Sequence, residues 1–143
     1  MFGRKTQVTH PDNGITNYNY DNVNLLSIQT ANLGNQGTVI KYIYDINRLT
    51  EIIFPPLPTG EQNFANVAYK YGATGNETGR VIFQKDGTGT QEMLYGNMGE
   101  MTMNVRKVVG PNIPTRIFKT VFNYDSWNRL HNMTYPDGET VKY

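Results

Sequence analysis

Hydrophobic and polar positions alternate in the segment from Phe118 to Tyr124. Aromatic residues and Thr120 occupy every second position, and Lys119, Val121 and Asn123 fall between them. A period of two is typical of a β-strand that turns one face towards a core. The pattern therefore predicts a strand that ends at Tyr124.

The same pattern occurs five times along the chain. Each copy has an aromatic or branched residue, a spacer, a tyrosine, then Asp or Gly, a turn and a second apolar stretch. The anchor tyrosines are Tyr20, Tyr44, Tyr71, Tyr95 and Tyr124, at spacings of 24, 27, 24 and 29 residues. Such a period indicates stacked supersecondary units. We predict an all-β fold over residues 1–143, with about five repeated antiparallel hairpins in one extended, twisted sheet. Curling of this sheet into a partial barrel or shell is a further option.

The turn chemistry supports hairpins in several copies. Asp125 opens a turn in which its carboxylate can accept the backbone N–H two residues on. The fourth position of the turn favours the left-handed conformation, and it is occupied by Asn24, Gly99 and Asn128 in three copies. In the second copy the turn is one residue shorter, and in the third it is three residues longer. Variation of length within turns is what stacked hairpins tolerate.

Proline positions add further turns. Pro136-Asp137-Gly138 is a turn after which residues 139–143 begin another strand. Residues 11–14, Pro-Asp-Asn-Gly, precede Tyr18 at the same offset as Pro136 precedes Tyr143, so we expect a fragment of a longer periodic array. The prolines of residues 55–58 and 111–114 are expected in loops or crossings, because proline is excluded from central strands.

The repeat residues resemble the YD repeat of the Rhs family. The resemblance covers residues 9–143, and its clearest copies are Tyr44-Asp45 with Arg48-Leu49 and Tyr124-Asp125 with Asn128-Arg129-Leu130. The full set of repeat positions is Tyr18, Tyr20, Asp21, Asn24, Tyr42, Tyr44, Asp45, Arg48, Leu49, Tyr69, Tyr71, Gly79, Arg80, Tyr95, Gly99, Tyr124, Asp125, Asn128, Arg129, Leu130, Pro136, Asp137 and Gly138.

This resemblance implies a function. The family comprises very large exported or displayed polypeptides, including bacterial toxins, wall-associated proteins and animal teneurins, in which similar hairpins form a hollow β shell around a carried domain. It implies a secreted or cell-surface location and a structural role, with the rest of the polypeptide and its carried domain as partners. Gly72 and Gly96 stand where the family has Asp, so the capping role of Asp is not expected in those two copies. The Asp-Pro-x-Gly segment for self-cleavage is absent, and no catalytic residue is carried over.

Composition excludes several functions. Thirteen Lys and Arg against twelve Asp and Glu give a net charge of +1, which offers no electrostatic footprint for nucleic acid. The absence of Cys excludes disulfides, thiolate metal sites and a Cys nucleophile. No run of eighteen apolar residues predicts a membrane span, and residues 1–10 show no signal-peptide pattern. Ten Tyr, six Phe and one Trp favour β structure.

Candidate chemistry is sparse. His10 and His131 lie at different phases of the repeat, without ligand spacing, so no metal is expected. Ser27 and Ser126 lack a nucleophile elbow. The glycine-rich residues 75–79 and 87–99 are interpreted as turns, not as phosphate loops. Residues 76–78 and 132–134 fit the N-glycosylation pattern, which is common by chance. We therefore expect no enzyme activity and no cofactor.

Three interpretations of the polar and aromatic residues remain open. Asp45 with Arg48, and Asp125 with Arg129, could line a polar site, but Asp caps with Arg along a neighbouring strand are the preferred interpretation. The Tyr rows, Trp127 and many Asn could bind carbohydrate or form an adhesive surface, as the alternative to a structural role. Open strand edges and a half-covered aromatic face are expected to favour self-association.

Overall fold

The computed structural model describes residues 3–12, 14–30, 38–56, 65–110 and 112–143. Over these residues the fold is all-β, as predicted, with no α-helix and one short 3₁₀ turn, η1. The strands are Gln7–His10 (β1), Gly14–Tyr20 (β2), Leu25–Thr30 (β3), Thr38–Asp45 (β4), Arg48–Ile53 (β5), Val67–Tyr71 (β6), Val81–Asp86 (β7), Gly89–Tyr95 (β8), Met101–Gly110 (β9), Ile113–Tyr124 (β10), Leu130–Thr134 (β11) and Thr140–Lys142 (β12), and η1 is Gly75–Glu77.

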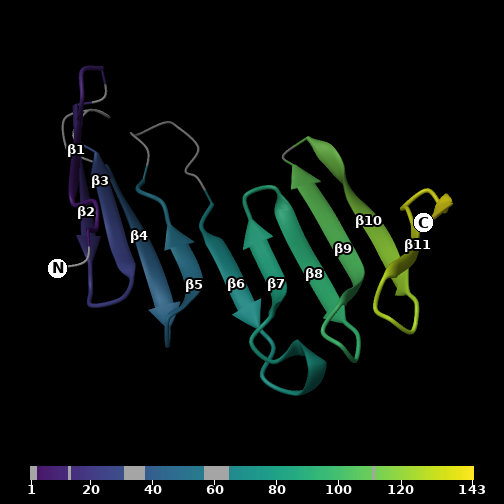
Figure 1. Cartoon of the computed structure of the whole chain (residues 1–143). Coiled ribbons are helices and arrows are strands. Elements are labelled where there is room, and N and C mark those ends of the chain that lie inside the picture. The colour runs from purple at the N-terminus through teal and green to yellow at the C-terminus, as the bar shows by residue number, and fades with distance from the viewer. Residues whose placement is uncertain (1–2, 13, 31–37, 57–64, 111) are drawn as a thin grey trace. The chain divides into compact units, whose positions relative to one another are not determined.

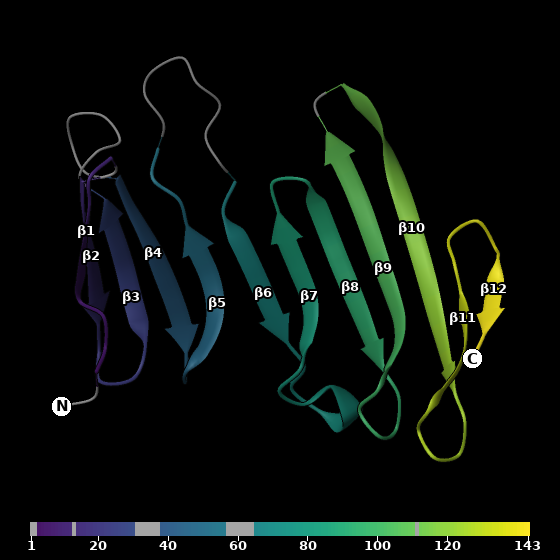
Figure 2. The same cartoon turned by 45° about the horizontal axis from the view of Figure 1, so that its top comes forward.

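The strands form one 12-stranded sheet whose spatial order is the sequence order from β1 to β12. The strand pairings established among the described residues are all antiparallel, as the hairpin pattern predicts. The order starts at β1 and ends at β12, so the ladder is open and not closed into a barrel. The chain divides within β6 into two compact units, which meet at Ala68 and Tyr69 in the sequence. Neighbouring strands are seen side by side within each unit in Figures 1 and 2.

The anchor tyrosines mark the ends of alternate strands. Tyr20, Tyr71, Tyr95 and Tyr124 are the last residues of β2, β6, β8 and β10, and Tyr44 is the last but one of β4. In four of these strands the pairing register shifts immediately before the tyrosine, which is the mark of a β-bulge. The repeat read from the sequence thus corresponds to a repeated backbone event, in which a strand ends next to a bulge and turns.

Threonine occupies the bulge in two copies. Thr50 and Thr102 are the extra residues of β5 and β9, opposite the step from Ile43 to Tyr44 and from Leu94 to Tyr95. The Thr50 hydroxyl donates to the Ile43 carbonyl (3.1 Å), and the Thr102 hydroxyl donates to the Leu94 carbonyl (3.3 Å). A side chain therefore supplies a hydrogen bond at the point where the ladder is interrupted.

Three turns close with the same pair of backbone hydrogen bonds. In the turn after β10, the Asn128 N–H donates to the Asp125 carbonyl (3.0 Å) and the Asp125 N–H donates to the Arg129 carbonyl (2.9 Å). The turns 96–100 and 135–139 repeat this pair with Gly99 and Gly138 in the place of Asn128. These three residues have φ of 59°, 78° and 92°. The left-handed conformation predicted for Asn128 and Gly99 is confirmed.

The corresponding prediction for Asn24 is wrong. Asn24 is absent from the positive-φ residues of the described structure. The Asp21 carboxylate accepts the N–H groups of both Val23 (2.6 Å) and Asn24, and the Asp21 N–H donates to the Asn24 carbonyl. Because the carboxylate closes this turn, a left-handed residue is not needed.

The second copy has a two-residue turn, one of the short turns that hairpins prefer. Asp45 pairs with Arg48, and Ile46 and Asn47 between them have φ of 43° and 64°. The predicted shortening is confirmed. The predicted cap by Asp45 is wrong, since no hydrogen bond from a backbone N–H to its carboxylate is found in the described part of the chain. Asp45 is itself the last residue of β4 and lies outside the two-residue loop.

The prediction for the second proline segment is also wrong in part. β10 begins at Ile113 and includes Pro114. The register against β9 shifts between Ile113 and Arg116, so this proline lies at an irregularity where a missing N–H is tolerated. Pro55 and Pro56 lie outside the strands, as expected, whereas residues 57, 58 and 111 are outside the described residues.

The glycine-rich segments are only partly turns. Residues 75–77 form η1, but Gly89 to Tyr95 form a complete strand, β8, which corrects the interpretation of residues 87–99 as turn structure. Gly89 has φ of 142°, and a Cβ there would lie 1.9 Å from the Lys107 carbonyl oxygen. Glycine is required because β9 approaches the backbone closely.

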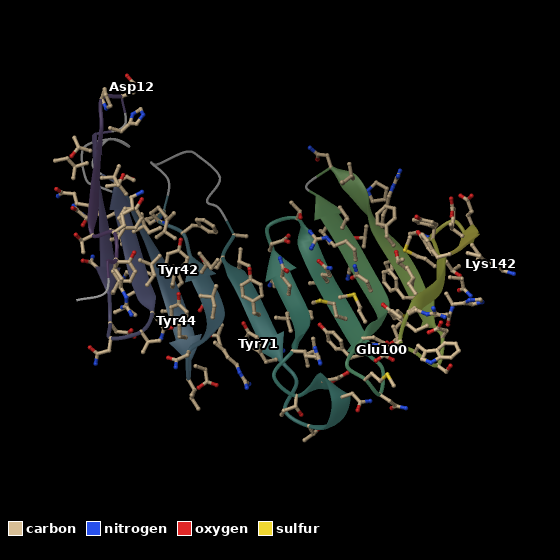
Figure 3. All side chains as sticks on the ribbon, viewed as in Figure 1. Asp12, Tyr42, Tyr44, Tyr71, Glu100 and Lys142 are labelled. Atoms are coloured by element: carbon tan, nitrogen blue, oxygen red, sulfur yellow. The ribbon has the colours of Figure 1, made fainter. Side chains whose placement is uncertain are left out.

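In the first unit, the strand register places the tyrosines on one face of the sheet. Tyr18 pairs with Ile28 and Ile28 with Ile40, while Tyr42 pairs with Ile52 and Ile52 with Val67. Paired residues share a face, as do residues two apart on a strand, so Tyr20 and Tyr44 join the same surface. We name it the tyrosine face. Tyr42 and Tyr44 lie along β4 in Figure 3.

The second unit has an equivalent face. Met93 pairs with Asn104 and Asn104 with Thr120, which places them with Phe122 and Tyr124 of β10 and with Tyr95 of β8. The opposite face carries polar pairs in both units. Examples are the side chains of Asn19 and Ser27 (3.0 Å) and of Asn123 and Asn132 (2.8 Å).

Burial is slight throughout the described structure. Met93, 7% exposed, is its one buried apolar side chain, and the five anchor tyrosines are only half-buried. The chain exposes 10375 Å², whereas a folded monomer of this mass exposes about 7,500 Å². In each unit all strands belong to the one sheet, so no second layer covers either face.

The left-handed turn residue provides a test of the hairpin geometry. We expect Asn128→Val to lower the free energy of unfolding by about 1–2 kcal/mol, because a branched residue is strained at positive φ. Asn128→Gly should change it by less than about 0.5 kcal/mol. Urea unfolding followed by circular dichroism measures both, and equal stability of the Val and Gly variants would contradict the assigned turn.

Candidate functional site

Two anchor tyrosines connect neighbouring hairpins through their hydroxyl groups. The Tyr95 hydroxyl, at the end of β8, donates to the carbonyl of Val81, the first residue of β7 (2.7 Å). The Tyr124 hydroxyl, at the end of β10, donates to the carbonyl of Met101, the first residue of β9 (3.0 Å). Each tyrosine thus fixes its strand end to the start of the preceding strand.

Basic side chains cover several of the tyrosine rings. The guanidinium of Arg4 lies 5.5 Å from the Tyr20 ring centre, and that of Arg80 lies 5.5 Å from the Tyr95 ring centre. Arg80 also fills the space beside Gly99, where a Cβ would lie 2.0 Å from its Nη2. These contacts occupy one side of a ring that a planar ligand would otherwise use.

Glu100 performs the capping role in the fourth copy, one of the two that lack Asp. Its carboxylate accepts the N–H of Met98 (2.8 Å), and a Cβ at Gly96 would lie 1.9 Å from Glu100 Oε1. In the last copy, Asp125 accepts the equivalent N–H of Trp127 (2.9 Å). A carboxylate from the last residue of the turn therefore replaces the one expected at the first turn position. Glu100 is labelled beside this turn in Figure 3.

Asp125 also forms an ion pair, which corrects the interpretation that Arg129 only lies along a neighbouring strand. Its carboxylate accepts the backbone N–H of Arg129 (2.9 Å) and lies 2.7 Å from the guanidinium. These hydrogen bonds, that of the Arg129 N–H first, hold the pKa of Asp125 below its ordinary value. The same guanidinium stacks 4.9 Å from the ring of Trp127, which is 75% exposed. The expected capping role of Asp125 is confirmed.

The least exposed ion pair lies within the second unit. Both guanidinium nitrogens of Arg106 bind the carboxylate of Asp86 at 3.0 Å, and the Thr88 N–H donates to it as well (2.8 Å). The hydrogen bonds from Arg106 are the main cause that holds the pKa of Asp86 well below its ordinary value. This pair joins β9 to the β7–β8 turn, and nothing in the sequence pattern signalled it.

No catalytic grouping is seen among the described residues. The His10 imidazole accepts the N–H of Asp12 (3.2 Å), and the Ser27 hydroxyl accepts a hydrogen bond from Asn19. The described ranges contain no cluster of three His, Cys, Asp or Glu residues that could hold a metal ion. Burial, followed by the neighbouring Tyr42, raises the pKa of Tyr44 above its ordinary value.

Two shallow cavities lie in the second unit. One, of about 530 Å³, is lined by Ile117, Phe118, Tyr135, Pro136, Asp137 and Glu139. The other, of about 350 Å³, lies between the turns that follow β8 and β10 and includes Asn97, Glu100, Asn123, Asp125 and Asn128. The second brings amide and carboxylate groups together, which is the kind of surface that sugars use.

No protein-family model matches the chain, and no curated protein matches it. The described residues include no helix that is long and apolar enough to cross a membrane. The arrangement of the sheet itself therefore carries the functional argument.

The Asp86–Arg106 pair predicts a pH dependence of stability. A carboxyl whose pKa is lowered by folding stabilises the protein above its unfolded pKa, and this contribution is lost as the pH falls. We expect Asp86→Asn to cost about 1–3 kcal/mol near pH 7. The variant should also lose less stability than the parent between about pH 6 and about pH 2.5. Urea unfolding at both pH values measures this difference, and parallel losses would contradict it.

The tyrosine hydroxyl bonds predict a second set of stability changes. Tyr95→Phe and Tyr124→Phe should each lower the free energy of unfolding by about 0.5–1.5 kcal/mol, because each leaves a carbonyl without its donor. Tyr42→Phe is the matched control, since its hydroxyl has no hydrogen bond in the described structure. Thermal unfolding compares the three variants. A loss in the control equal to that in the other two would show that ring packing, not the hydroxyl, carries the effect.

Proposed function

We propose that this chain is a structural segment of a large secreted or surface-displayed polypeptide of the Rhs type. In this role its hairpins form part of a β wall that encloses or displays another domain. Its partners are the remainder of the same polypeptide and the carried domain, and the role needs no cofactor and no catalytic residue.

The observation that carries this proposal is the half-buried tyrosine face of a one-layer sheet. Tyr18, Tyr20, Tyr42 and Tyr44 project from one face of the first unit, and none of them is buried. Burial of an aromatic or branched side chain contributes about 1.5–3 kcal/mol. A face with this many such residues gains substantially from a covering layer.

The exposed area supports the same conclusion. The 10375 Å² of the chain exceeds that of an ordinary monomer by about 2,900 Å². This excess is larger than a standard protein interface, which buries about 1,600 Å² in total. A wall segment that meets further layers of its own polypeptide accounts for the excess, whereas a self-contained enzyme domain would have a buried core.

The repeated construction of the strand ends also supports a wall. Four of the five anchor tyrosines follow a bulge, and the Tyr95 and Tyr124 hydroxyls bind the preceding strand. Such contacts can be repeated from one hairpin repeat to the next and need no central site. Function then lies in continuity of the sheet and not in one pocket.

Carbohydrate binding is the second candidate, favoured by one observation. Trp127 is 75% exposed at a turn that borders the cavity with Asn97, Asn123 and Asn128. An exposed indole beside amide groups suits a sugar ring. Against this, one side of the indole already carries the Arg129 guanidinium.

Tyrosine footprinting distinguishes the two functions. We expect hydroxyl-radical labelling of Tyr42 and Tyr44 to fall at least about threefold when the chain is expressed within its complete polypeptide, because the tyrosine face is then covered. Trp127, at a turn, is the internal control and should change little. Equal labelling of the tyrosines in both forms would contradict the wall function. Binding on a glycan array that is lost in Trp127→Ala would support the second candidate.

A further inference from the structure

One interior strand of the second unit carries an unpaired edge. β10 extends from Ile113 to Tyr124, but β11 pairs only with the part from Val121 to Tyr124. Among the described strands, residues 114–120 therefore have β9 on one side and none on the other. We name residues 114–120 the β10 ledge. Figure 2 shows β10 continuing well beyond the end of β11.

The register identifies which backbone groups of the ledge are free. The Tyr135 N–H donates to the Glu139 carbonyl and the Tyr143 N–H to the His131 carbonyl, so odd-numbered residues of β11 bond to β12. Even-numbered residues of β11 therefore bond to β10, where Thr134 meets Val121. The backbone N–H and C=O groups of successive residues point to opposite sides of a strand. Those of Lys119 and Ile117 therefore point away from β9, to the same side as those of Val121.

The β10 ledge also exposes large apolar side chains, which is unusual for an unpaired strand edge. Ile117 is 65% exposed and Phe118 40%, and the neighbouring Tyr135 is 37% exposed. These three line the cavity of about 530 Å³ together with Pro136, Asp137 and Glu139. An unpaired strand edge beside an apolar cavity is the surface that accepts an added strand.

We propose that the β10 ledge is a dimerisation surface, and that its occupant is the β10 ledge of a second copy of this chain. The two ledges run antiparallel about a two-fold axis at Ile117, so that Ile117 of one copy forms the hydrogen-bonded pair with Ile117 of the other. Two copies related in this way present the same residues to each other. Lys119 of one copy then lies opposite Thr115 of the other.

The charges around the ledge are complementary to this arrangement. Arg116 shares the face of Phe118, because the two alternate on β10, opposite Val108 and Arg106 of β9. In the dimer, Arg116 of the second copy lies next to Phe118 and the turn that carries Asp137. The guanidinium thus reaches an aromatic ring and a carboxylate that line the cavity.

The same charges select the register. A pairing centred on Lys119 would place two ammonium groups directly opposite each other, which is unfavourable. The pairing centred on Ile117 places Lys119 opposite the uncharged Thr115. Lysine and proline commonly protect exposed edges, and here Lys119 and Pro114 disfavour alignments that place either residue at the two-fold axis.

This surface differs from the terminal edges of the sheet. Pairing of β1 of one copy with β12 of another would extend the sheet at its ends and would lead to open-ended assemblies. Pairing through the ledge uses one patch twice and closes at two copies.

A charge-exchange series tests the proposal. Sedimentation equilibrium from about 10 μM to about 1 mM should show a monomer–dimer equilibrium, since a small interface of this kind is weak. Arg116→Glu and Asp137→Lys should each weaken the dimer at least about tenfold, because each places like charges together. The double variant R116E/D137K should return to within about threefold of the parent.

Two further variants provide the controls. Ile117→Lys places two like charges at the two-fold axis and should abolish the dimer. Lys41→Glu makes the same charge change as Arg116→Glu at an exposed position of the first unit and should have no effect. A monomer at every concentration, assemblies that grow beyond two copies, or failure of the double variant to restore dimerisation would each overturn the proposal.

Discussion

The structure depends on the fact that a single β layer has two surfaces and no interior. Its backbone groups are satisfied by the ladder between neighbouring strands, but its side chains have at most one layer against which to pack. Met93 is the one apolar side chain in the described residues that becomes buried under these conditions. Stability must therefore come from the ladder, from rows of side chains across strands, and from whatever lies against the tyrosine face.

The strand ends show how the chain meets this constraint locally. Each repeat needs a turn and a carboxylate or backbone group to satisfy it, and four of the five copies add a bulge. Different copies achieve this with different residues. Asp125 caps from the start of its turn and Glu100 from the end of its turn, whereas the second copy relies on a two-residue loop. The geometry is repeated more faithfully than the residues are, because several side chains can satisfy the same backbone groups.

The sequence was informative where the cause is local. The alternation of residues with a period of two predicted strands, and these strands end at the anchor tyrosines. The residue types of Asn128 and Gly99 predicted the left-handed conformation in their turns. Features that depend on pairing between distant segments were missed. The Asp86–Arg106 pair needs the register of β7, β8 and β9, and the bulge positions of Thr50 and Thr102 need the register of their hairpins. Asn24 and Pro114 were misjudged because a carboxylate in one case, and a register shift in the other, removed the constraint on which each prediction was based. For function, the sequence indicated a family resemblance and rows of tyrosines. The structure adds that the tyrosine face is half-buried and belongs to a one-layer sheet.

The heat capacity change of unfolding tests the central claim most directly. It scales with the apolar surface exposed on unfolding, and ordinary globular domains give about 12–15 cal/mol/K per residue. Scanning calorimetry of the isolated chain, at a concentration where it is monomeric, should give a value clearly below this range, because a one-layer sheet buries little apolar surface. A value within the range would show that the chain has an ordinary core and would contradict the account of an uncovered wall segment.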